Sequence, residues 1–409
     1  MSQYSDPISN DSLQYDIAIA GGGIVGATLA AALKNSGLKI VLIEAQLPEQ
    51  SIIKPQAYAL SVLSSRILKG IGVWEKIFPH IGRFENIKLS DGNYPNLVPF
   101  ETQDLGTEYL GYVGEHRVIL SALQEFLTSC PQVEWVRPAK VVAVEYGTNQ
   151  AKIRVKQGDQ DCHLTAKLVV GADGAKSQIR SLAGIKTRGW KYWQSCVAFT
   201  IQHQAAVNNI AFERFCETGP MGVLPLPGNR CQIVWTAPHA QAKELAEMAE
   251  SAFITQLEQR LNGVLGSVNL VSPRLLFPVQ LMQSDRYVQP RLALVGDAAH
   301  CCHPVGGQGL NLGIRDAAAL AQVLHEAVQK KEDIGQLSVL KCYETWRKTE
   351  NLLILGFTDF LDRLFSNDWL PLVVVRRLGI EMMRHIHPIK VLALQLMTGL
   401  LGRHPRLSQ

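Results

Sequence analysis

Three stretches of this chain combine glycines with an acidic residue where an apolar strand pattern gives way to a helical one. In the most C-terminal stretch, Leu292–Val295 is an apolar strand that reaches Asp297, and a helical pattern starts at Leu310. The loop between them holds three glycines, Gly306, Gly307 and Gly309. Glycines let a ligand approach the backbone, and a helix N-terminus carries unpaired N–H groups and roughly half a positive charge. The stretch fits a site for an anionic ligand whose hydroxyl groups bind Asp297. It fits equally a tight strand–helix connection with a solvated aspartate.

The first of the three stretches reads as a βαβ unit. Strands over Tyr15–Ala20 and Lys39–Ile43 flank a helix of small residues, and Glu44 follows the second strand. The turn GGGIVG contains a GxGxxG pattern made by Gly21, Gly23 and Gly26. These glycines permit a tight turn, close approach of a pyrophosphate and helix–strand packing, and the acid would accept hydrogen bonds from ribose hydroxyls. The unit predicts a site for NAD(P) or FAD, and its N-terminal position, with further nucleotide motifs downstream, favours FAD.

The middle stretch places Asp173 and Gly174 between a strand over Leu168–Val170 and a helical pattern. It is either a second nucleotide contact or a helix start capped by Asp173. Arg117 lies at the start of a predicted helix over Val118–Leu127, where the helix dipole does not stabilise a cation. A phosphate nearby would explain this arginine, and so would a position on the surface.

Composition indicates a globular protein of two or three domains. The chain has 409 residues, of which 47% are hydrophobic and 19% charged, and its net charge of +4 gives no reason to expect nucleic acid as a partner. From Trp369 to the end, six Lys and Arg residues stand against Glu381 alone, a surplus of five positive charges. This basic, apolar tail suggests a surface for lipid head groups or an acidic partner, with helix packing or a homo-oligomer interface as an equal alternative.

Cysteine usage and hydropathy predict a cytoplasmic protein, peripheral on the inner face of a membrane if the basic tail binds lipid. The eight cysteines show no CxxC spacing, and Met1–Gln14 is polar, without the apolar run of a secretory signal. We therefore expect free thiols in a reducing compartment. No stretch reaches about 18 uninterrupted apolar residues, so no transmembrane helix is predicted, and Val391–Leu401 is too short to span.

The remaining pattern alternates between strands and helices. A helix is predicted over Ser61–Leu68, and strands over Phe84–Leu89 and Tyr109–Val113. An antiparallel meander is predicted over Val141–Glu145, Lys152–Lys156 and His163–Thr165. Further strands are expected over Val197–Gln202, Ala211–Phe215, Met221–Leu224 and Cys231–Thr236, followed by one helix over Ala240–Leu261. From Ser338 onward the chain reads as helical, with breaks at Pro371, Pro388 and Pro405.

Taken in order, the three junctions are GGGIVG, VVGADGAKSQIR and LALVGDAAHCCHPVGGQGLNLGIRDAAAL. This set resembles the flavoprotein monooxygenases related to para-hydroxybenzoate hydroxylase. Four further stretches resemble the ring hydroxylases of ubiquinone biosynthesis: QAYALSVLSSRILKGIGVW, GWKYWQ, FERFCETGPMGVLPLPG, and CYETWR with NLLILGFTDFLDRLF. The likeness covers nearly the whole chain.

The resemblance implies an α/β fold in three parts. A Rossmann-like FAD-binding domain would comprise residues 1–83, 110–185 and 282–335. An inserted, mainly antiparallel β-sheet substrate domain would comprise residues 84–109 and 186–281, and a C-terminal helical region residues 336–409.

The resemblance also implies roles for individual residues. Gly21, Gly23, Gly26 and Glu44 would hold the ADP half of a tightly, non-covalently bound FAD, Asp297 its ribityl chain, and Arg117 a further part of FAD. The flavin pyrimidine edge would face the loop and helix start made by Gly306, Gly307, Gln308, Gly309, Leu310 and Asn311. Asp173 would serve both FAD and a transiently bound NAD(P)H. Relatives usually carry Arg at the position of Gln56, so a phosphate-facing cation is missing there unless Lys54 replaces it.

The implied reaction is hydroxylation of the aromatic ring of a polyprenylated phenol in ubiquinone or related isoprenoid-quinone biosynthesis. NAD(P)H would reduce FAD, and O₂ would form a flavin C4a-hydroperoxide that the ring attacks. The chemistry belongs to the cofactor, so no catalytic side chain is assigned. The alternatives are a prenyl reductase or other flavin oxidoreductase on the same scaffold, and a non-catalytic FAD-binding subunit of a quinone-biosynthesis complex. A halogenase is disfavoured because 47–60 lacks the expected lysine and tryptophan motif.

Two smaller features remain open. The run His300–His303 (HCCH) is not expected to bind metal, since contiguous ligands rarely converge on one ion; its histidines either relay a proton or are loop residues held by hydrogen bonds. A sheet face with Val223, Leu224 and Trp235 would suit a hydrophobic, prenylated ring, although any of the three fits an ordinary sheet core.

Overall fold

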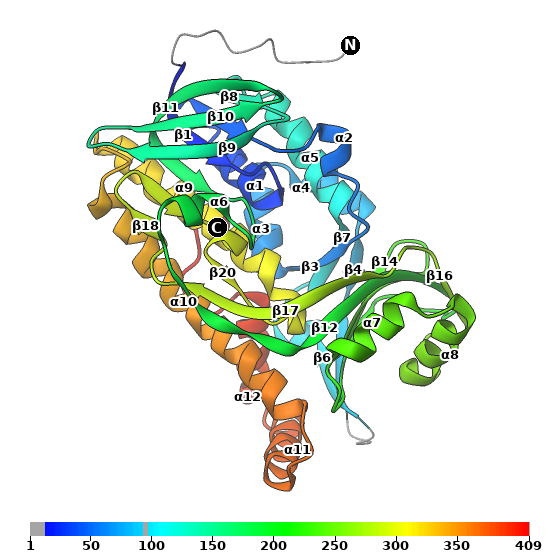
Figure 1. The fold of residues 1–409 in the computed structure, drawn as a ribbon. Coiled ribbons are helices and arrows are strands. Elements are labelled where there is room, and N and C mark those ends of the chain that lie inside the picture. Colours follow the sequence, from blue (N-terminus) through cyan, green and yellow to red (C-terminus); the bar gives the residue numbers. More distant parts are fainter. Residues whose placement is uncertain (1–12, 93–96, 409) are drawn as a thin grey trace.

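The computed structural model describes residues 13–92 and 97–408, and it contains three sheets with helices packed around them (Figure 1). Most of the segment Met1–Gln14, on which the expectation of no secretory signal rests, lies outside the described residues. The three-part domain limits given above stay a prediction.

The first sheet aligns the three glycine-and-acid junctions at one edge. Its main path runs β18 (Val288–Gln289), β19 (Leu292–Leu294), β11 (Gln160–Gly171), β1 (Leu13–Ala20), β2 (Ile40–Ile43), β8 (Val133–Val136). The pairs β1–β2, β1–β11 and β11–β19 are parallel, and Ala20 is level with both Ile43 and Gly171, which is level with Leu294. The carboxyl ends of four strands therefore stop together, at the edge where ligands bind in α/β sheets.

Three helices cover this sheet and begin or end near the same edge. They are α1 (Ile24–Ala32), α5 (His116–Thr128) and α9 (Gln308–Gln329). α1 packs against both α5 and α9 (Figure 1). The long α9 is buried along most of its length, and the small side chains of Ala317–Ala319 let neighbouring elements pack closely against it.

The predicted meander is present, with one difference. β9 (Lys140–Tyr146) and β10 (Ala151–Gln157) pair antiparallel, and β10 pairs antiparallel with β11. His163–Thr165 and Leu168–Val170, predicted as separate strands, are parts of β11. No glycine or proline interrupts residues 160–170, so the strand continues from the meander directly into the parallel sheet.

The second sheet is mainly antiparallel (Figure 1). Its path is β20 (His300–Cys301), β17 (Leu275–Ser284), β12 (Thr187–His203), β15 (Arg230–Pro238), β14 (Met221–Leu226), β13 (Ile210–Phe215), β5 (Asn86–Asp91), β6 (Val98–Glu101), and β16 (Val268–Leu270) also pairs with β12. The predicted strand Phe84–Leu89 is two strands. Phe84 ends β4 (Gly82–Phe84), which pairs with β7 (Gly111–Glu115) in a third sheet completed by β3 (Ala57–Ser61).

The helix predicted over Ala240–Leu261 is also two, α7 (His239–Glu247) and α8 (Glu250–Leu261). Met248 and Ala249 between them are extended. The Arg274 guanidinium, just before β17, donates to the carbonyls of Leu245 and Met248, at 2.8 and 2.6 Å, and so satisfies the end of α7. No local sequence pattern shows this contact.

The C-terminal region consists of α10 (Leu337–Phe365), α11 (Leu370–His385) and α12 (His387–Thr398). The breaks fall just before the predicted prolines, because Pro371 and Pro388 occupy the first turns of α11 and α12. No helix within the described residues has both the length and the apolarity to cross a bilayer. The other helices are α2 (Pro48–Ser51), α3 (Val62–Ile71), α4 (Trp74–Ile77), α6 (Gln178–Leu182) and the 3₁₀ turns η1 (Phe78–His80), η2 (Thr102–Asp104), η3 (Gly296–Ala298), η4 (Val305–Gly307) and η5 (Arg406–Ser408).

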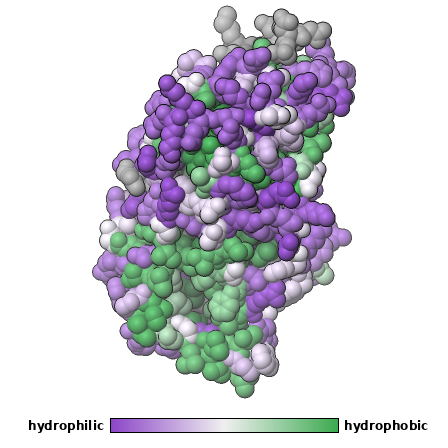
Figure 2. Space-filling view, turned by 90° about the vertical axis from the view of Figure 1, so that its left-hand side faces the viewer, coloured by the Kyte–Doolittle hydropathy of each residue, from purple (hydrophilic) through white to green (hydrophobic). Residues whose placement is uncertain are grey.

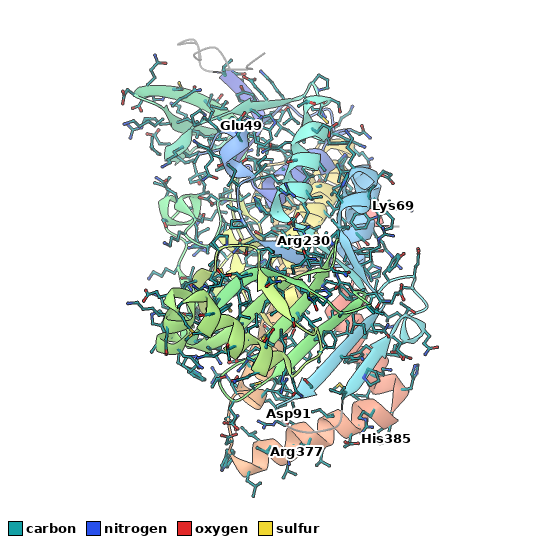
Figure 3. All side chains as sticks on the ribbon, turned by 90° about the vertical axis from the view of Figure 1, so that its right-hand side faces the viewer. Glu49, Lys69, Asp91, Arg230, Arg377 and His385 are labelled. Carbon is teal, nitrogen blue, oxygen red and sulfur yellow. The ribbon has the colours of Figure 1, made fainter. Side chains whose placement is uncertain are left out.

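Several basic residues of the tail are paired with acids of the body. Arg376 is buried and donates through Nε to Asp91 at 2.9 Å, and Figure 3 shows Asp91 beside α11. Lys390 Nζ lies 2.8 Å from Asp104. The positive surplus read from the sequence therefore holds the C-terminal helices against the sheets.

We predict that Asp91→Ala loosens α11 before the rest of the fold, since it leaves a buried guanidinium unpaired, at a cost of about 3–5 kcal/mol. Amide exchange across α11 should accelerate while β1 stays protected. Asp161→Ala is the control, because its partner Arg154 is exposed, and it should leave exchange in both elements unchanged. Unchanged exchange in α11 of the Asp91 variant would contradict this role.

Candidate active site

A cavity of about 850 Å³ lies at the edge where the parallel strands end. Residues from all three junctions line it, together with part of the second sheet. The predicted site residues that line it are Gly21, Gly23, Glu44, Asp173, Gly307, Gln308, Gly309, Leu310 and Asp297. Four predicted site residues are not among its lining: Gly26, Arg117, Gly306 and Asn311.

The first turn is tightly built. Gly21 has φ +104°, and a Cβ there would lie 2.4 Å from the carbonyl oxygen of Ala172. A Cβ on Gly26 would lie 1.9 Å from the Gly21 carbonyl oxygen, so this glycine lets α1 approach the turn. Glu44 accepts hydrogen bonds from the N–H groups of Gly22 at 2.7 Å and Gln46 at 2.9 Å, which hold its carboxylate at the cavity wall.

Asp297 presents an unpaired carboxylate to the cavity. The side chain is exposed on that side, and no hydrogen bond from the described residues reaches its carboxylate oxygens. Desolvation by surrounding protein raises the pKa of Asp297, and the nearby His300 opposes that rise. The carboxylate is therefore free to accept hydrogen bonds from a ligand.

Asp173 differs from Asp297 because the protein already occupies its carboxylate. It accepts from Ser177 Oγ at 2.5 Å and from the N–H groups of Gln178 and Ile179 at 2.7 and 3.1 Å. Ser177, not Asp173, is the N-cap residue of α6, yet Asp173 satisfies the same helix start. This agrees with the helix-capping interpretation, while the residue still lines the cavity.

Arg117 lies on the surface. Its side chain is 68% exposed and its guanidinium is 3.4 Å from Glu115. Gln56 and Lys54 both line the cavity, so a cation at either position would face it.

The loop before α9 is fixed by Asn311. Gly306 and Gly307 have φ of +66° and +61°, in the left-handed region that favours glycine. The Asn311 side chain donates to the carbonyls of Ala59 and Gly307, each at 2.8 Å, and accepts from Ser61 N at 2.8 Å. It thus ties the loop to β3 and does not face the larger cavity.

A second, apolar cavity of about 200 Å³ adjoins the first. It lies between the second sheet, the Gly306–Gly307 loop and the C-terminal helices. Both cavities are lined by Ala59, Leu224, Val234, Pro304, Gly307 and Gln308. Of the three residues predicted to hold a hydrophobic ring, only Leu224 faces the cavities. Val223 and Trp235 point to the opposite side and are buried beneath α7 and α8 in the sheet core, as strand alternation requires.

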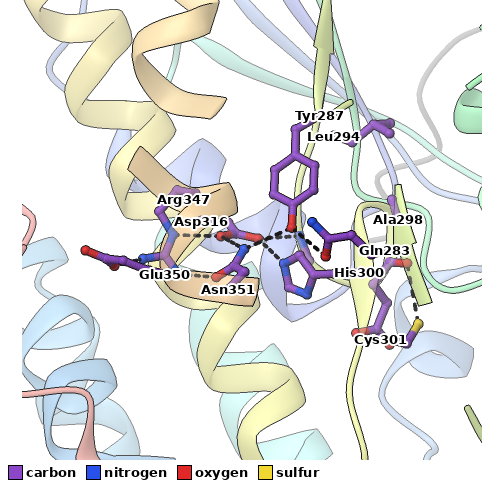
Figure 4. A network of polar contacts seen from close by, with 12 residues as sticks. Gln283, Tyr287, Leu294, Ala298, His300, Cys301, Asp316, Arg347, Glu350 and Asn351 are labelled. Atoms are coloured by element: carbon purple, nitrogen blue, oxygen red, sulfur yellow. Dashed lines mark hydrogen bonds and ion pairs between the residues drawn. The ribbon is translucent and has the colours of Figure 1, made fainter. Parts of the chain in front are cut away.

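A buried network centred on Asp316 holds the Asp297 loop in place (Figure 4). Asp316 lies on α9 and accepts from His300 Nε2 at 2.6 Å, Arg347 Nε at 2.8 Å and the N–H of Gly296 at 3.1 Å. Asn351 on α10 donates to the same carboxylate at 3.0 Å. Burial alone would raise the pKa of Asp316, but His300 and Arg347 bring it well below the ordinary value. The same carboxylate therefore pairs with Arg347 and fixes the loop at Gly296 and His300.

The HCCH run is held by hydrogen bonds. His300 joins the Asp316 network, and His303 is buried with Nε2 3.3 Å from Gln194 Oε1. Burial lowers the pKa of His303 to about 3, so it is neutral at physiological pH. No group of three His, Cys, Asp or Glu side chains that could hold a metal occurs in the described part of the chain.

Sequence reasoning missed Glu213, an acidic residue that lines the apolar cavity. Alternation along β13 places Ala211, Glu213 and Phe215 on one face, and the other two are buried apolar residues. A charged residue at the inward position of an apolar strand is the signal that could have found it.

We predict that Asp316→Asn lowers the free energy of unfolding by about 3–5 kcal/mol at pH 7, because it removes the fully buried charge partner of Arg347 and leaves only the partly exposed Glu350. The folded-state pKa of Asp316 is depressed, so its stabilisation is present above the unfolded carboxyl pKa of about 4 and is lost as the pH falls further. The difference between the free energies of unfolding of the two proteins, measured by urea unfolding, should narrow below about pH 4. Glu125→Gln, which removes an exposed pair with Lys76, should cost less than about 1 kcal/mol at every pH. A difference between wild type and the Asp316 variant that does not change with pH would contradict the stabilising role of this carboxylate.

Comparisons with known proteins agree with this architecture. The family model described as "FAD binding domain" matches residues 14–350. An uncharacterized protein of Synechocystis sp. is 60% identical over 97% of this chain and 95% of its own. Ubiquinone hydroxylase UbiL of Rhodospirillum rubrum is 36% identical over 95% of this chain and 91% of its own, and 3-demethoxyubiquinol 3-hydroxylase of Escherichia coli is 33% identical over 94% and 98%.

The fold is also that of solved flavin monooxygenases. The crystal structure of p-nitrophenol 4-monooxygenase PnpA from Pseudomonas putida has a TM-score of 0.81 at 19% identity, over 96% of this chain and 99% of that one. PqsL from Pseudomonas aeruginosa, described as a probable FAD-dependent monooxygenase, has a TM-score of 0.74 at 23% identity, over 86% and 97%. The chain belongs to the FAD-binding family of aromatic hydroxylases that includes the hydroxylases of ubiquinone biosynthesis.

Proposed function

We propose that this protein hydroxylates the aromatic ring of a prenylated phenol in the biosynthesis of ubiquinone or a related isoprenoid quinone. The observation that carries this proposal is the shared wall between a large cavity with polar groups and an apolar one. A cofactor in the first would adjoin a hydrophobic ring in the second. Two relatives are named for ubiquinone hydroxylation, which supports the same substrate class here.

The residues of the larger cavity fit FAD. The tight turn at Gly21 and the start of α1 suit the pyrophosphate, and the unpaired Asp297 suits the hydroxyls of a ribityl chain. Glu44, which follows β2 and lines the cavity, would accept hydrogen bonds from the adenosine ribose. The start of α9 at Gln308–Leu310 offers backbone N–H groups to the pyrimidine edge of the ring system.

When bound, FAD supplies the redox chemistry, with electrons from NAD(P)H and an oxygen atom from O₂. The chain's own contribution is position and exclusion of water. Leu224 and Val234 would orient the substrate ring at the shared wall, and the aromatic and aliphatic side chains beyond them would keep it dry. Partial positive charge at the start of α9 would favour an electron-rich ring system there.

We also propose that the substrate reaches the apolar cavity from a membrane surface. Met383 on α11 and Leu394 and Met397 on α12 line the cavity. The outer faces of the same region expose large apolar side chains, among them Leu353, Phe360, Trp369, Leu370, Val374, Val375, Leu378 and Leu392. Figure 2 shows apolar residues gathered over the lower part of the molecule, where α11 and α12 lie. Because several basic residues of this region are paired with acids of the protein, insertion of the apolar side chains into the membrane would provide the free energy of membrane binding.

The function is tested by adding prenylated phenols to the FAD-loaded protein with NAD(P)H and measuring O₂ consumption and product mass. Ring hydroxylation would increase the product mass by one oxygen. Donor oxidation with loss of a prenyl double bond and no O₂ uptake would indicate a reductase instead. Bound FAD with no oxidation of NAD(P)H in the presence of any prenylated phenol would indicate a non-catalytic subunit.

We predict that Asp297→Ala weakens FAD binding about 10- to 150-fold, the loss expected for hydrogen bonds to a charged group. The fold should survive, because no hydrogen bond from the described residues depends on this carboxylate. Flavin absorbance after gel filtration, with circular dichroism as the folding check, measures both. Asp159→Ala, at an exposed turn, is the control. FAD occupancy equal to wild type in the Asp297 variant would contradict the site.

We predict that Val374→Glu combined with Leu378→Glu weakens binding to neutral phospholipid vesicles at least about tenfold. These residues lie one helical turn apart on α11, are 48% and 58% exposed, and would each lose roughly 1–2 kcal/mol of apolar burial. Vesicle sedimentation measures the change, and wild-type binding should vary little with salt. The paired control is Val207→Glu with Val264→Glu, two exposed valines in the loop before β13 and the turn after α8. Equal loss in both double variants would contradict a docking face on α11.

A further inference from the structure

Glu213 is the one ionisable side chain among the described residues that line the apolar cavity. The rest of the lining is apolar side chains, a few neutral polar ones and backbone. An isolated carboxylate in such surroundings is costly unless it has a partner, and it is expected where chemistry needs it.

Strand register places Glu213 near the wall that the two cavities share. It lies opposite Gly222 on β14, and Gly222 lies opposite Val234 on β15, which lines both cavities. The carboxylate accepts a hydrogen bond from the backbone N–H of Gly306, next to Gly307, which also lines both. A Cβ on Gly222 would be 3.6 Å from Oε2, so the absence of a side chain there leaves room beside the carboxylate.

No cation of the described residues neutralises Glu213. On β5, Lys88 extends over the Phe212 ring, and on β13 Arg214 donates to the Arg260 carbonyl. On α10, Asp362 accepts from Ser366, 2.9 Å away, and lies 3.4 Å from His303. Burial and the negative charge of Glu213 both raise the pKa of the Cys196 thiol on β12, so that thiol stays protonated.

Burial raises the pKa of Glu213 to about 7, opposed only by the Gly306 hydrogen bond. A base is most effective when its pKa lies near the working pH. Below about pH 7 the carboxyl is protonated and cannot accept a proton; above it the carboxylate can.

We propose that Glu213 is the base that receives the phenol proton of the substrate, an assignment that rests on the proposed function. The phenol O–H bond breaks, its proton moves to a carboxylate oxygen, and the bonding pair stays on the phenol oxygen. The ring becomes more electron-rich where it must attack an electrophilic oxygen. The ring then loses its C–H proton, which leaves in the water formed from the second oxygen atom of O₂, and regains aromaticity. The proton held by Glu213 returns to the same phenol oxygen.

The first test uses Glu213→Gln in the FAD-loaded protein. Product formation should fall about 10²- to 10⁴-fold, the range for loss of a general base, while FAD content and reduction by NAD(P)H stay as in wild type. Wild-type product formation should drop tenfold per pH unit below about pH 7, and the variant should lack this limb. Glu217→Gln, at an exposed position four residues along, should behave as wild type. A Glu213→Gln variant that keeps the acid limb, or stays within threefold of wild type, overturns the proposal.

The second test needs no turnover. A prenylated phenol and its O-methyl ether are titrated into the oxidised FAD-loaded protein at pH 8, with the flavin absorbance change as the signal. Wild type should bind the phenol about tenfold more tightly, the value of one hydrogen bond to a charged acceptor, and Glu213→Leu should bind both equally. Wild type without this preference, or a Leu variant that keeps it, overturns the proposal. Absence of hydroxylated product from wild type would instead refute the proposed function, and the binding preference would still decide the role of Glu213.

Discussion

The alignment of four parallel strand ends is the constraint on which the rest of the structure depends. Ala20, Ile43, Gly171 and Leu294 stop at one level, although they are up to 274 positions apart in the sequence. A shift of register in any pair would move its junction away from the edge and carry Glu44, Asp173 or Asp297 with it. The cavity exists because three turns leave the sheet at the same height.

The third turn needs more support than register, because it is followed by a long loop. Asp316 supplies it by joining the loop at Gly296 and His300 to α10 at Arg347 and Asn351. Asn311 adds a second tie, from α9 to β3. With both in place, Gly307 is held at the wall where a polar cavity and an apolar one meet. That juxtaposition, more than any single side chain, favours oxidation of a hydrophobic ring.

Much of the scaffold could be predicted because its signals are local. The GGGIVG turn, the acid after each strand and the apolar runs of the parallel sheet depend on neighbours in sequence, and the structure has each of them. The family and the cofactor followed from the order of three such motifs. The break between α7 and α8 could not be predicted, because the end of α7 is satisfied by Arg274, which is distant in sequence.

For several residues the sequence left two interpretations open, because function or pairing depends on the face that a side chain takes. Trp235 and Val223 have the right chemistry for a ring pocket but face the helices, while Leu224 and Glu213 face the cavity. Arg376 and Lys390 belong to the basic tail, for which lipid binding and helix packing were equally open, and their pairing with Asp91 and Asp104 fits helix packing. The alternation of side chains along a strand, or an ion-pair partner distant in sequence, determines where each of these side chains lies. Neither can be read from composition.

The most direct measurement of the central claim is a crystal structure of the oxidised protein with FAD and a prenylated phenol bound. We expect the isoalloxazine ring system in the larger cavity, ending at the wall made by Leu224, Val234, Pro304 and Gly307, with the phenol ring across that wall. A flavin elsewhere, or a phenol ring that does not enter the apolar cavity, would contradict it.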